Sequence, residues 1–301
     1  MIWLSTVFTG LSIGSILLLI ALGLTYTFGQ MGVINMAHGE FIMAGAYTAY
    51  MIQKVVHDPT ASLALALPAA FVVAGVMGIA LEVTLIRRLY GRPLDTLLVT
   101  FGVSLILQQQ AKDRFGAPNV NVRAPEWLSG GLNVGSITLP YTRMAIMVLV
   151  ALVLAAVALA TTKLPAGRQM RAVVQNRNLA AVSGIRTGRV DRTTFFLGSG
   201  LAGVAGVALT LMGSIGFSLG TKYIVDAFLV VVVGGLGQLR GAVIAALALG
   251  LLSAGSETFI GQLHVTDSAS SLAKVVVFIS IVVFLQVRPQ GLVAVRSRSI
   301  A

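Results

Sequence analysis

Nine stretches of mostly apolar residues follow one another along this chain, separated by short polar breaks. A helix that crosses a lipid bilayer needs roughly 20 apolar residues, and most of these stretches approach or exceed that length. Because lipid offers the backbone no hydrogen-bond partners, each stretch must pair its own backbone groups, as a helix does. The stretches are residues 4–28, 33–53, 63–86, 94–109, 141–161, 193–216, 225–233, 242–256 and 272–287.

The composition supports a membrane protein, because 56% of the 301 residues are hydrophobic and only 10% are charged. We predict an all-α fold, a polytopic transmembrane helical bundle of eight or nine spans in a single domain over residues 1–301. The stretches 94–109 and 225–233 are shorter than the hydrocarbon layer is thick, so we expect half-helices or re-entrant segments there. The first stretch lacks the basic region of a signal peptide and is expected to be a retained span.

The basic residues are unevenly distributed, and the net charge is +11. With the amino terminus placed outside, Arg87, Arg88, the basic residues of 163–192 and Arg288 all fall on one side of the membrane. Loops rich in Lys and Arg mark the cytoplasmic side. We therefore predict an external amino terminus and a cytoplasmic carboxyl terminus, and we attribute the basic excess to orientation rather than to nucleic-acid binding.

A weak internal repeat is visible in the small residues. A shift of 202 residues brings the glycines and alanines of 32–46 into register with those of 234–248. Both copies would enter the membrane from the same side, so we predict a parallel internal repeat of the kind that transporter folds use around a central pathway. Chance matching is the alternative, because small residues are common in membrane helices.

Polar side chains interrupt two of the apolar stretches. Asn35, His38 and Glu40 lie among glycines, where they could line a solute path or hold a backbone bend. Glu40 has a simpler explanation, because a carboxylate is favoured at the amino end of a helix. Thr100, Ser104 and Gln108 recur every fourth residue and therefore share one helix face. This face suits a small polar solute, and hydrogen bonding between helices explains it equally well.

The region 163–192 is the longest predicted cytoplasmic segment. Within it, residues 171–185 (RAVVQNRNLAAVSGI) are predicted to form one short amphipathic helix that Gly184 closes. Such a helix could dock on a partner protein or lie on anionic lipid. We favour a partner, because a helix held between two loops can transmit a push into the adjoining spans.

The sequence contains no pattern that indicates an enzyme. There is no cysteine, and no G-x-x-x-x-G-K-[ST] loop that would cradle nucleotide phosphates. The three histidines, His38, His57 and His264, are too far apart for a local metal motif. We therefore expect no catalytic residue, no metal site and no cofactor in this chain.

The segment GVINMAHGEFIMAGAYTAY resembles the first-helix region of permeases of the branched-chain amino-acid and urea ABC importers. The resemblance covers essentially the whole chain, including RQMRAVVQNRNLAAVSGI and the closing LQVRPQGLVA. The former resembles the family's coupling loop for the ATPase, although the leading glutamate of the general importer pattern is missing. By this resemblance, the residues assigned to coupling are Arg171, Arg177, Ala180, Ala181, Gly184 and Ile185.

The resemblance implies an assembly in the bacterial inner membrane. Its expected partners are a second, related permease subunit in a heterodimer, two cytoplasmic subunits that bind ATP, and a periplasmic solute-binding protein. Within the family, FGVSLILQQ and FGAPNVNVRAPEWLSGG are most similar to the urea permease branch, so alternating-access transport of urea is the first expectation. A branched-chain amino-acid permease is the close alternative, and a channel-like facilitator or a membrane scaffold is a more distant one.

Overall fold

The structure is a computed structural model, and it describes residues 2–134, 137–262 and 269–293. Eleven α-helices lie in this part of the chain, and an antiparallel hairpin of β1 (Gly131–Val134) and β2 (Ile137–Pro140) joins α4 to α5. The helices are α1 (Ile2–Met31), α2 (His38–Val55), α3 (Pro59–Thr84), α4 (Pro93–Phe115), α5 (Tyr141–Lys163), α6 (Pro165–Gln175), α7 (Arg177–Val182), α8 (Thr187–Thr210), α9 (Leu219–Gly234), α10 (Leu239–Gln262) and α11 (Ala269–Val287).

The predicted helical membrane bundle is confirmed, because each of the nine apolar stretches corresponds to one helix. In the described residues, six helices are long and apolar enough to cross a membrane. These six are α1, α3, α5, α8, α10 and α11. The other three long helices, α2, α4 and α9, are shorter or more polar, and they carry most of the polar residues considered below.

The helices α1 and α8 form the centre of the bundle, and most of their residues are buried. Both helices contain many small residues, which let neighbouring backbones approach closely. A Cβ atom added to Gly45 of α2 would lie 2.1 Å from the carbonyl oxygen of Gly203 in α8. A Cβ atom on Gly203 would in turn lie 2.3 Å from the carbonyl oxygen of Ala70 in α3. Three helices therefore meet at positions where no side chain fits.

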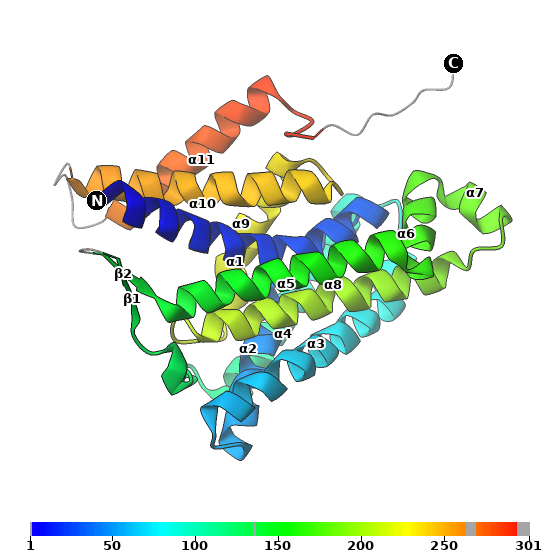
Figure 1. The fold of residues 1–301 in the computed structure, drawn as a ribbon. Helices are drawn as coiled ribbons and strands as arrows, with labels where there is room; N and C mark the ends of the chain where they lie inside the picture. Colours follow the sequence, from blue (N-terminus) through cyan, green and yellow to red (C-terminus); the bar gives the residue numbers. More distant parts are fainter. Residues whose placement is uncertain (1, 135–136, 263–268, 294–301) are drawn as a thin grey trace.

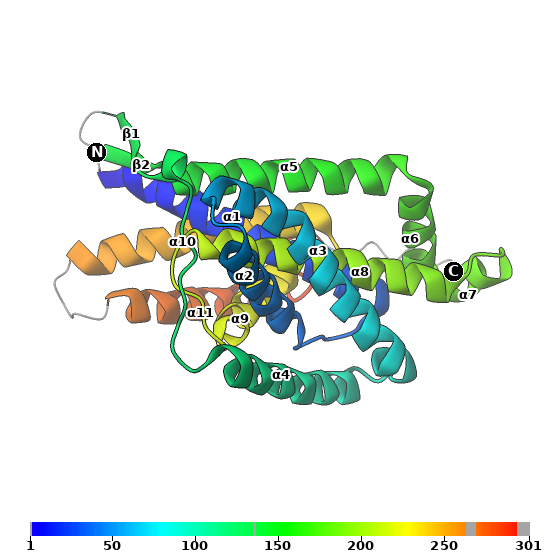
Figure 2. The same ribbon diagram turned by 90° about the horizontal axis from the view of Figure 1, so that it is seen from below.

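The bundle has two distinct ends. The helices α1, α5, α8 and α10 run roughly along one direction, with the β-hairpin and the start of α1 at one end (Figure 1). The helices α6 and α7 project from the opposite end, and the view from below shows the same separation (Figure 2). In that view α4 lies at the edge of the bundle, away from α5.

Two predictions about element boundaries are wrong. The stretch 94–109 is not a half-helix, because α4 runs from Pro93 to Phe115 over 23 residues, as long as α5. Polar residues in its last two turns shortened the apolar stretch without ending the helix. The stretch 33–53 also starts too early, since α1 continues to Met31 and α2 begins only at His38. By contrast α9 is short, at 16 residues.

The proposed repeat units both contain a helix break, and the two breaks lie within one residue of each other in the register of 202 residues. Gly32, between α1 and α2, has φ +62°, and Gly235, between α9 and α10, has φ +99°. Positive φ angles are strained for residues that carry a Cβ atom, so glycine suits both breaks. The breaks agree with the parallel repeat, which stays a prediction.

Candidate functional site

The polar residues predicted near the start of α2 are all buried. Asn35, His38 and Glu40 are each at most 1% exposed. They do not converge on one space, however, because each side chain has different surroundings. His38 Nε2 lies 3.2 Å from the carbonyl oxygen of Ile20 in α1. Both polar side-chain atoms of Asn35 lack a hydrogen-bond partner in the described part of the chain.

Glu40 is the centre of a hydrogen-bond network that joins α2 to α4. Ser104 Oγ and Gln108 Nε2 each donate to Glu40 Oε1 at 2.8 Å. Gln108 Nε2 also lies 2.8 Å from Thr221 Oγ1 in α9. A buried carboxylate in an apolar region is costly unless donors satisfy it. The network therefore stabilises Glu40 and attaches the peripheral helix α4 to the bundle.

Thr100 lies one turn earlier on the same face of α4 and makes different contacts. Its hydroxyl oxygen accepts a hydrogen bond from the backbone N–H of Met36 at 3.0 Å. This places Thr100 against the segment between α1 and α2. Thr100 and Ser104 of the predicted stripe are buried against protein and Gln108 is partly exposed, and all three form hydrogen bonds with neighbouring segments.

The predicted coupling segment forms two helices, so the prediction of one helix over residues 171–185 is wrong. The helix α6 ends at Gln175, and α7 begins at Arg177. Asn176 separates them in an extended conformation, and its Oδ1 accepts a hydrogen bond from the backbone N–H of Leu179 at 2.9 Å. Asparagine is a preferred N-cap residue, which explains why a new helix starts after Asn176. Gly184 follows α7 with φ +83°, as the predicted closing glycine.

The helix α7 is attached to the bundle by an ion pair. Arg177 donates to both carboxylate oxygens of Asp191 in α8, at 3.0 and 2.5 Å. The Asp191 side chain is 1% exposed and that of Arg177 is 41% exposed, so the carboxylate is shielded from water while the guanidinium is partly open to it. These hydrogen bonds raise the pKa of the Arg177 guanidinium, which therefore stays charged. A bidentate pair of this kind holds its two partners in a defined orientation.

The ion pair continues into a cluster that reaches α3 and α1. The Arg177 guanidinium lies 5.0 Å from the centre of the Tyr90 ring. The Tyr90 hydroxyl lies 3.1 Å from Glu82 Oε1 in α3 and 3.4 Å from Met31 Sδ at the end of α1. Burial raises the pKa of Tyr90, and the Asp191 and Glu82 carboxylates raise it further, so the hydroxyl remains a donor. We call Glu82, Tyr90, Arg177 and Asp191 the coupling cluster.

The other predicted coupling residues lie around α7 in two environments. Ala180 is buried against Met170, Val173 and Val190, and Ile185 packs at the edge of this small core. Ala181 and Gly184 are exposed. Arg171 donates a hydrogen bond to the carbonyl oxygen of Thr161 at the end of α5. The helix pair is therefore fixed on its inner side and open on its outer side.

The outer side of α7 presents apolar residues. Leu179 is 63% exposed and Val182 is 83% exposed. They lie at the end of the molecule where α6 and α7 project (Figures 1 and 2). Apolar side chains on a projecting polar helix pair are typical of a surface that docks into a groove of another protein.

Sequence reasoning missed three residues of the coupling cluster, namely Glu82, Tyr90 and Asp191. Glu82 offered a signal, because an acid inside a predicted span is costly and indicates a buried partner. Asp191 offered no such signal, because it lies outside the predicted spans, in the cytoplasmic segment 163–192, where an acid is not costly. Tyr90 offered none, because its contacts depend on how α3, α7 and α8 meet.

These features together define a polytopic membrane protein with a helical bundle and a helix pair that projects from one end. The chain belongs to the family described as branched-chain amino acid transport system / permease component, whose model matches residues 6–285.

Curated relatives match over nearly the whole chain. The high-affinity branched-chain amino acid transport system permease protein LivH of Escherichia coli (strain K12) is 29% identical, over 96% of this chain and 95% of its own length. BraD of Pseudomonas aeruginosa, described in the same words, is also 29% identical with the same coverage. A probable LivH of Methanocaldococcus jannaschii is 27% identical, over 93% of this chain and 89% of its own. No solved structure matches the chain significantly.

Proposed function

We propose that this chain is the permease subunit of an ATP-binding cassette importer for branched-chain amino acids. The observation that carries the proposal is the near full-length match to relatives described as branched-chain amino acid permeases. The projecting helices α6 and α7 support the ATP-driven part of the proposal, because a passive channel needs no such docking element. Urea was the first expectation from the sequence. The proposal replaces it with the close alternative, branched-chain amino acids.

The proposed assembly contains several partners. A second, related permease completes the membrane part, and a periplasmic binding protein delivers the solute. Two cytoplasmic subunits bind and hydrolyse ATP, so this chain needs no nucleotide site. In this assembly the exposed Leu179 and Val182 of α7 enter a groove on one ATPase subunit.

The proposed coupling route starts at α7 and runs through the coupling cluster. Movement of the ATPase subunits pushes α7, and the pair of Arg177 and Asp191 transmits the push to α8. Tyr90 and Glu82 extend it to α3 and to the end of α1. Because packed helices switch between discrete arrangements, a small push at one end can change access at the other.

The polar residues between α2 and α4 have a supporting role in this proposal. Thr100, Ser104 and Glu40 hold α4 in place, while Gln108 is partly exposed and contacts α9. Of the six residues predicted to line a path, Gln108 is the one best placed to meet a solute. His38 instead links the start of α2 to α1 through the carbonyl oxygen of Ile20.

Uptake measurements test the proposal and its urea alternative together. Radiolabelled leucine and urea are supplied separately, at micromolar concentration, to cells with and without a clean deletion of this gene. We expect the deletion to abolish leucine uptake alone, and the gene on a plasmid to restore it. Loss of urea uptake alone would transfer the chain to the urea branch, and loss of neither would refute the assigned cargo.

A further inference from the structure

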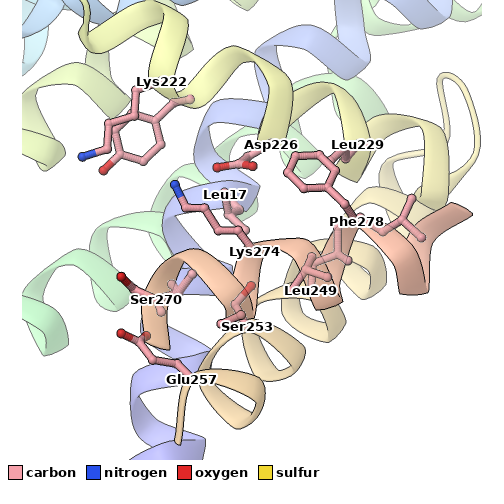
Figure 3. A pocket seen from close by; sticks show the side chains of 15 residues that line it. Leu17, Lys222, Asp226, Leu229, Leu249, Ser253, Glu257, Ser270, Lys274 and Phe278 are labelled. Atoms are coloured by element: carbon pink, nitrogen blue, oxygen red, sulfur yellow. The ribbon is translucent and has the colours of Figure 1, made fainter. Parts of the chain in front are cut away.

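A cavity of about 370 Å³ lies between α1, α9, α10 and α11, apart from both clusters described above. Its lining includes four charged side chains and two serines, Lys222, Asp226, Glu257, Lys274, Ser253 and Ser270 (Figure 3). The apolar part of the lining includes Leu229, Leu249 and Phe278. Protein cavities that bind small molecules typically start at about 300 Å³, so this one suits a small solute.

The lining is divided into a polar side and an apolar side. Figure 3 shows Lys222, Ser270 and Glu257 toward one side, with Asp226 and Lys274 near the middle. Leu229, Leu249 and Phe278 lie toward the other side. The space between them therefore suits a molecule that is charged at one end and apolar at the other.

The charged groups of the cavity lie beyond ion-pair distance of one another, although Lys274 still interacts electrostatically with Asp226. In the parts of the chain that the structure describes, no ion pair within 4.0 Å involves Asp226, Glu257, Lys222 or Lys274. Asp226 is half-buried in α9, whereas Lys222, Glu257 and Lys274 are exposed. A half-buried acid within a membrane bundle is costly and commonly marks a site that binds a charged ligand. Because the cavity contains both acidic and basic side chains, we expect a ligand that carries a positive and a negative charge.

We propose that this cavity binds the zwitterion of an α-amino acid with an apolar side chain. The ammonium group of the ligand meets Asp226 and Glu257, and its carboxylate meets Lys274 and Lys222. The hydrocarbon side chain lies against Leu229, Leu249 and Phe278. This inference rests on the proposed function and adds a binding site within the permease itself. Urea, which is neutral, carries no charge that could pair with these four groups.

The position of the cavity suits the entry side of an importer. Its polar lining comes from the first halves of α9 and α11 and the last half of α10, and α1 contributes residues near its middle. These parts lie toward the end that carries the β-hairpin, opposite to α6 and α7 (Figure 1). A solute released by a binding protein at that end would meet the cavity before it passed the coupling cluster.

Direct binding to the purified, complete transporter tests the site. The probe is radiolabelled leucine, measured without the binding protein present. We expect saturable binding to the wild type, and at least about tenfold weaker binding to Asp226→Asn and to Lys274→Met, because each loses a charge-assisted hydrogen bond. Lys112→Met and Asp113→Asn, at the exposed end of α4, are the matched controls and should bind as the wild type does.

Ligands that lack one charge assign each contact to its residue. 3-Methylbutylamine has no carboxylate and 4-methylpentanoate has no ammonium group, so both should compete poorly with leucine in the wild type. In Lys274→Met the weak competition by the amine should be unchanged, while leucine loses affinity. In Asp226→Asn the weak competition by 4-methylpentanoate should be unchanged, while leucine again loses affinity. Competition as strong as that of leucine, from either compound in the wild type, would overturn the site without any variant.

The outcomes separate this inference from the proposed function. If the wild type imports leucine and both cavity variants bind and import it normally, the site is wrong and the proposed function stands. If cells import no leucine through the wild type, the proposed function itself fails. Size-exclusion profiles check that both variants assemble into the complete transporter. If one of them does not, competition between leucine and the two singly charged analogues in the wild type decides whether the site is correct.

Discussion

Arg177 of α7 and Asp191 of α8 form a bidentate ion pair whose carboxylate is 1% exposed. This pair links a helix on the outside of the bundle to a helix at its centre. A small projecting helix with six residues has little packing of its own, so its position depends on such contacts. The proposed coupling route therefore relies on this pair to carry a movement of α7 to α8.

Arg177→Ala is expected to uncouple transport. The substitution leaves the buried Asp191 carboxylate unpaired and removes charge-assisted hydrogen bonds worth about 1.5–3 kcal/mol each. We expect leucine uptake to fall about tenfold or more, with a normal amount of protein in the membrane. Arg177→Lys should give an intermediate result, because lysine cannot form the bidentate contact. Arg189→Ala, at an exposed base in the first turn of α8, is the control and should transport normally.

Gly184→Pro is expected to leave membrane insertion intact and to abolish coupling. Gly184 has φ +83°, and its backbone N–H donates to the carbonyl oxygen of Ala181 at 3.1 Å. Proline fixes φ near −65° and has no N–H group, so the turn after α7 must change. The measurements are protein level and leucine uptake, with Gly188→Ala, which has open space around it, as the control. Normal uptake by the proline variant would refute a coupling role for this turn.

Glu40→Leu is expected to loosen α4, and Glu40→Gln is expected to retain most of its attachment. Leucine removes the acceptor for Ser104 and Gln108, which costs roughly 1–3 kcal/mol when donors are left unsatisfied. Glutamine keeps an oxygen that can accept from both. Limited trypsin digestion of the detergent-purified protein measures the difference, because Arg92 and Lys112 lie near the ends of α4.

The control for Glu40 is Gln109→Leu. Gln109 is exposed, and its amide contacts Asp113 of the same helix at 2.8 Å. We expect its digestion to match the wild type. Equal digestion of Glu40→Leu and wild type would show that packing, rather than the hydrogen-bond network, holds α4.

Much of the bundle could be predicted from the sequence because apolar stretches of spanning length have one solution in lipid. The prediction failed where polarity changed within one helix, as in α4, whose last turns contain Gln108, Gln109 and Lys112. It also failed at Asn176, although asparagine before a short helix is a known N-cap signal. A continuous amphipathic pattern on both sides concealed that break.

The candidate sites could be predicted only in part, because they combine distant segments. The fourfold spacing of Thr100, Ser104 and Gln108 correctly indicated one face, while Glu40, the partner of Ser104 and Gln108, lies more than 60 positions away from both. The coupling cluster joins Glu82, Tyr90, Arg177 and Asp191 from three parts of the chain. The charged cavity likewise needs α9, α10 and α11 to be packed together. Such contacts follow from helix packing rather than from local spacing.

The orientation in the membrane can be measured with single cysteines, because the chain contains none of its own. Glu126 is exposed beside the β-hairpin, and Ser183 is exposed after α7, at the opposite end of the bundle. The positive-inside rule places the first site outside and the second in the cytoplasm. Glu126→Cys should therefore react with a membrane-impermeant maleimide in intact cells, whereas Ser183→Cys should react only after permeabilisation. The reverse pattern would invert the topology and place α6 and α7 beyond the reach of cytoplasmic ATPase subunits, which would refute the proposed coupling route.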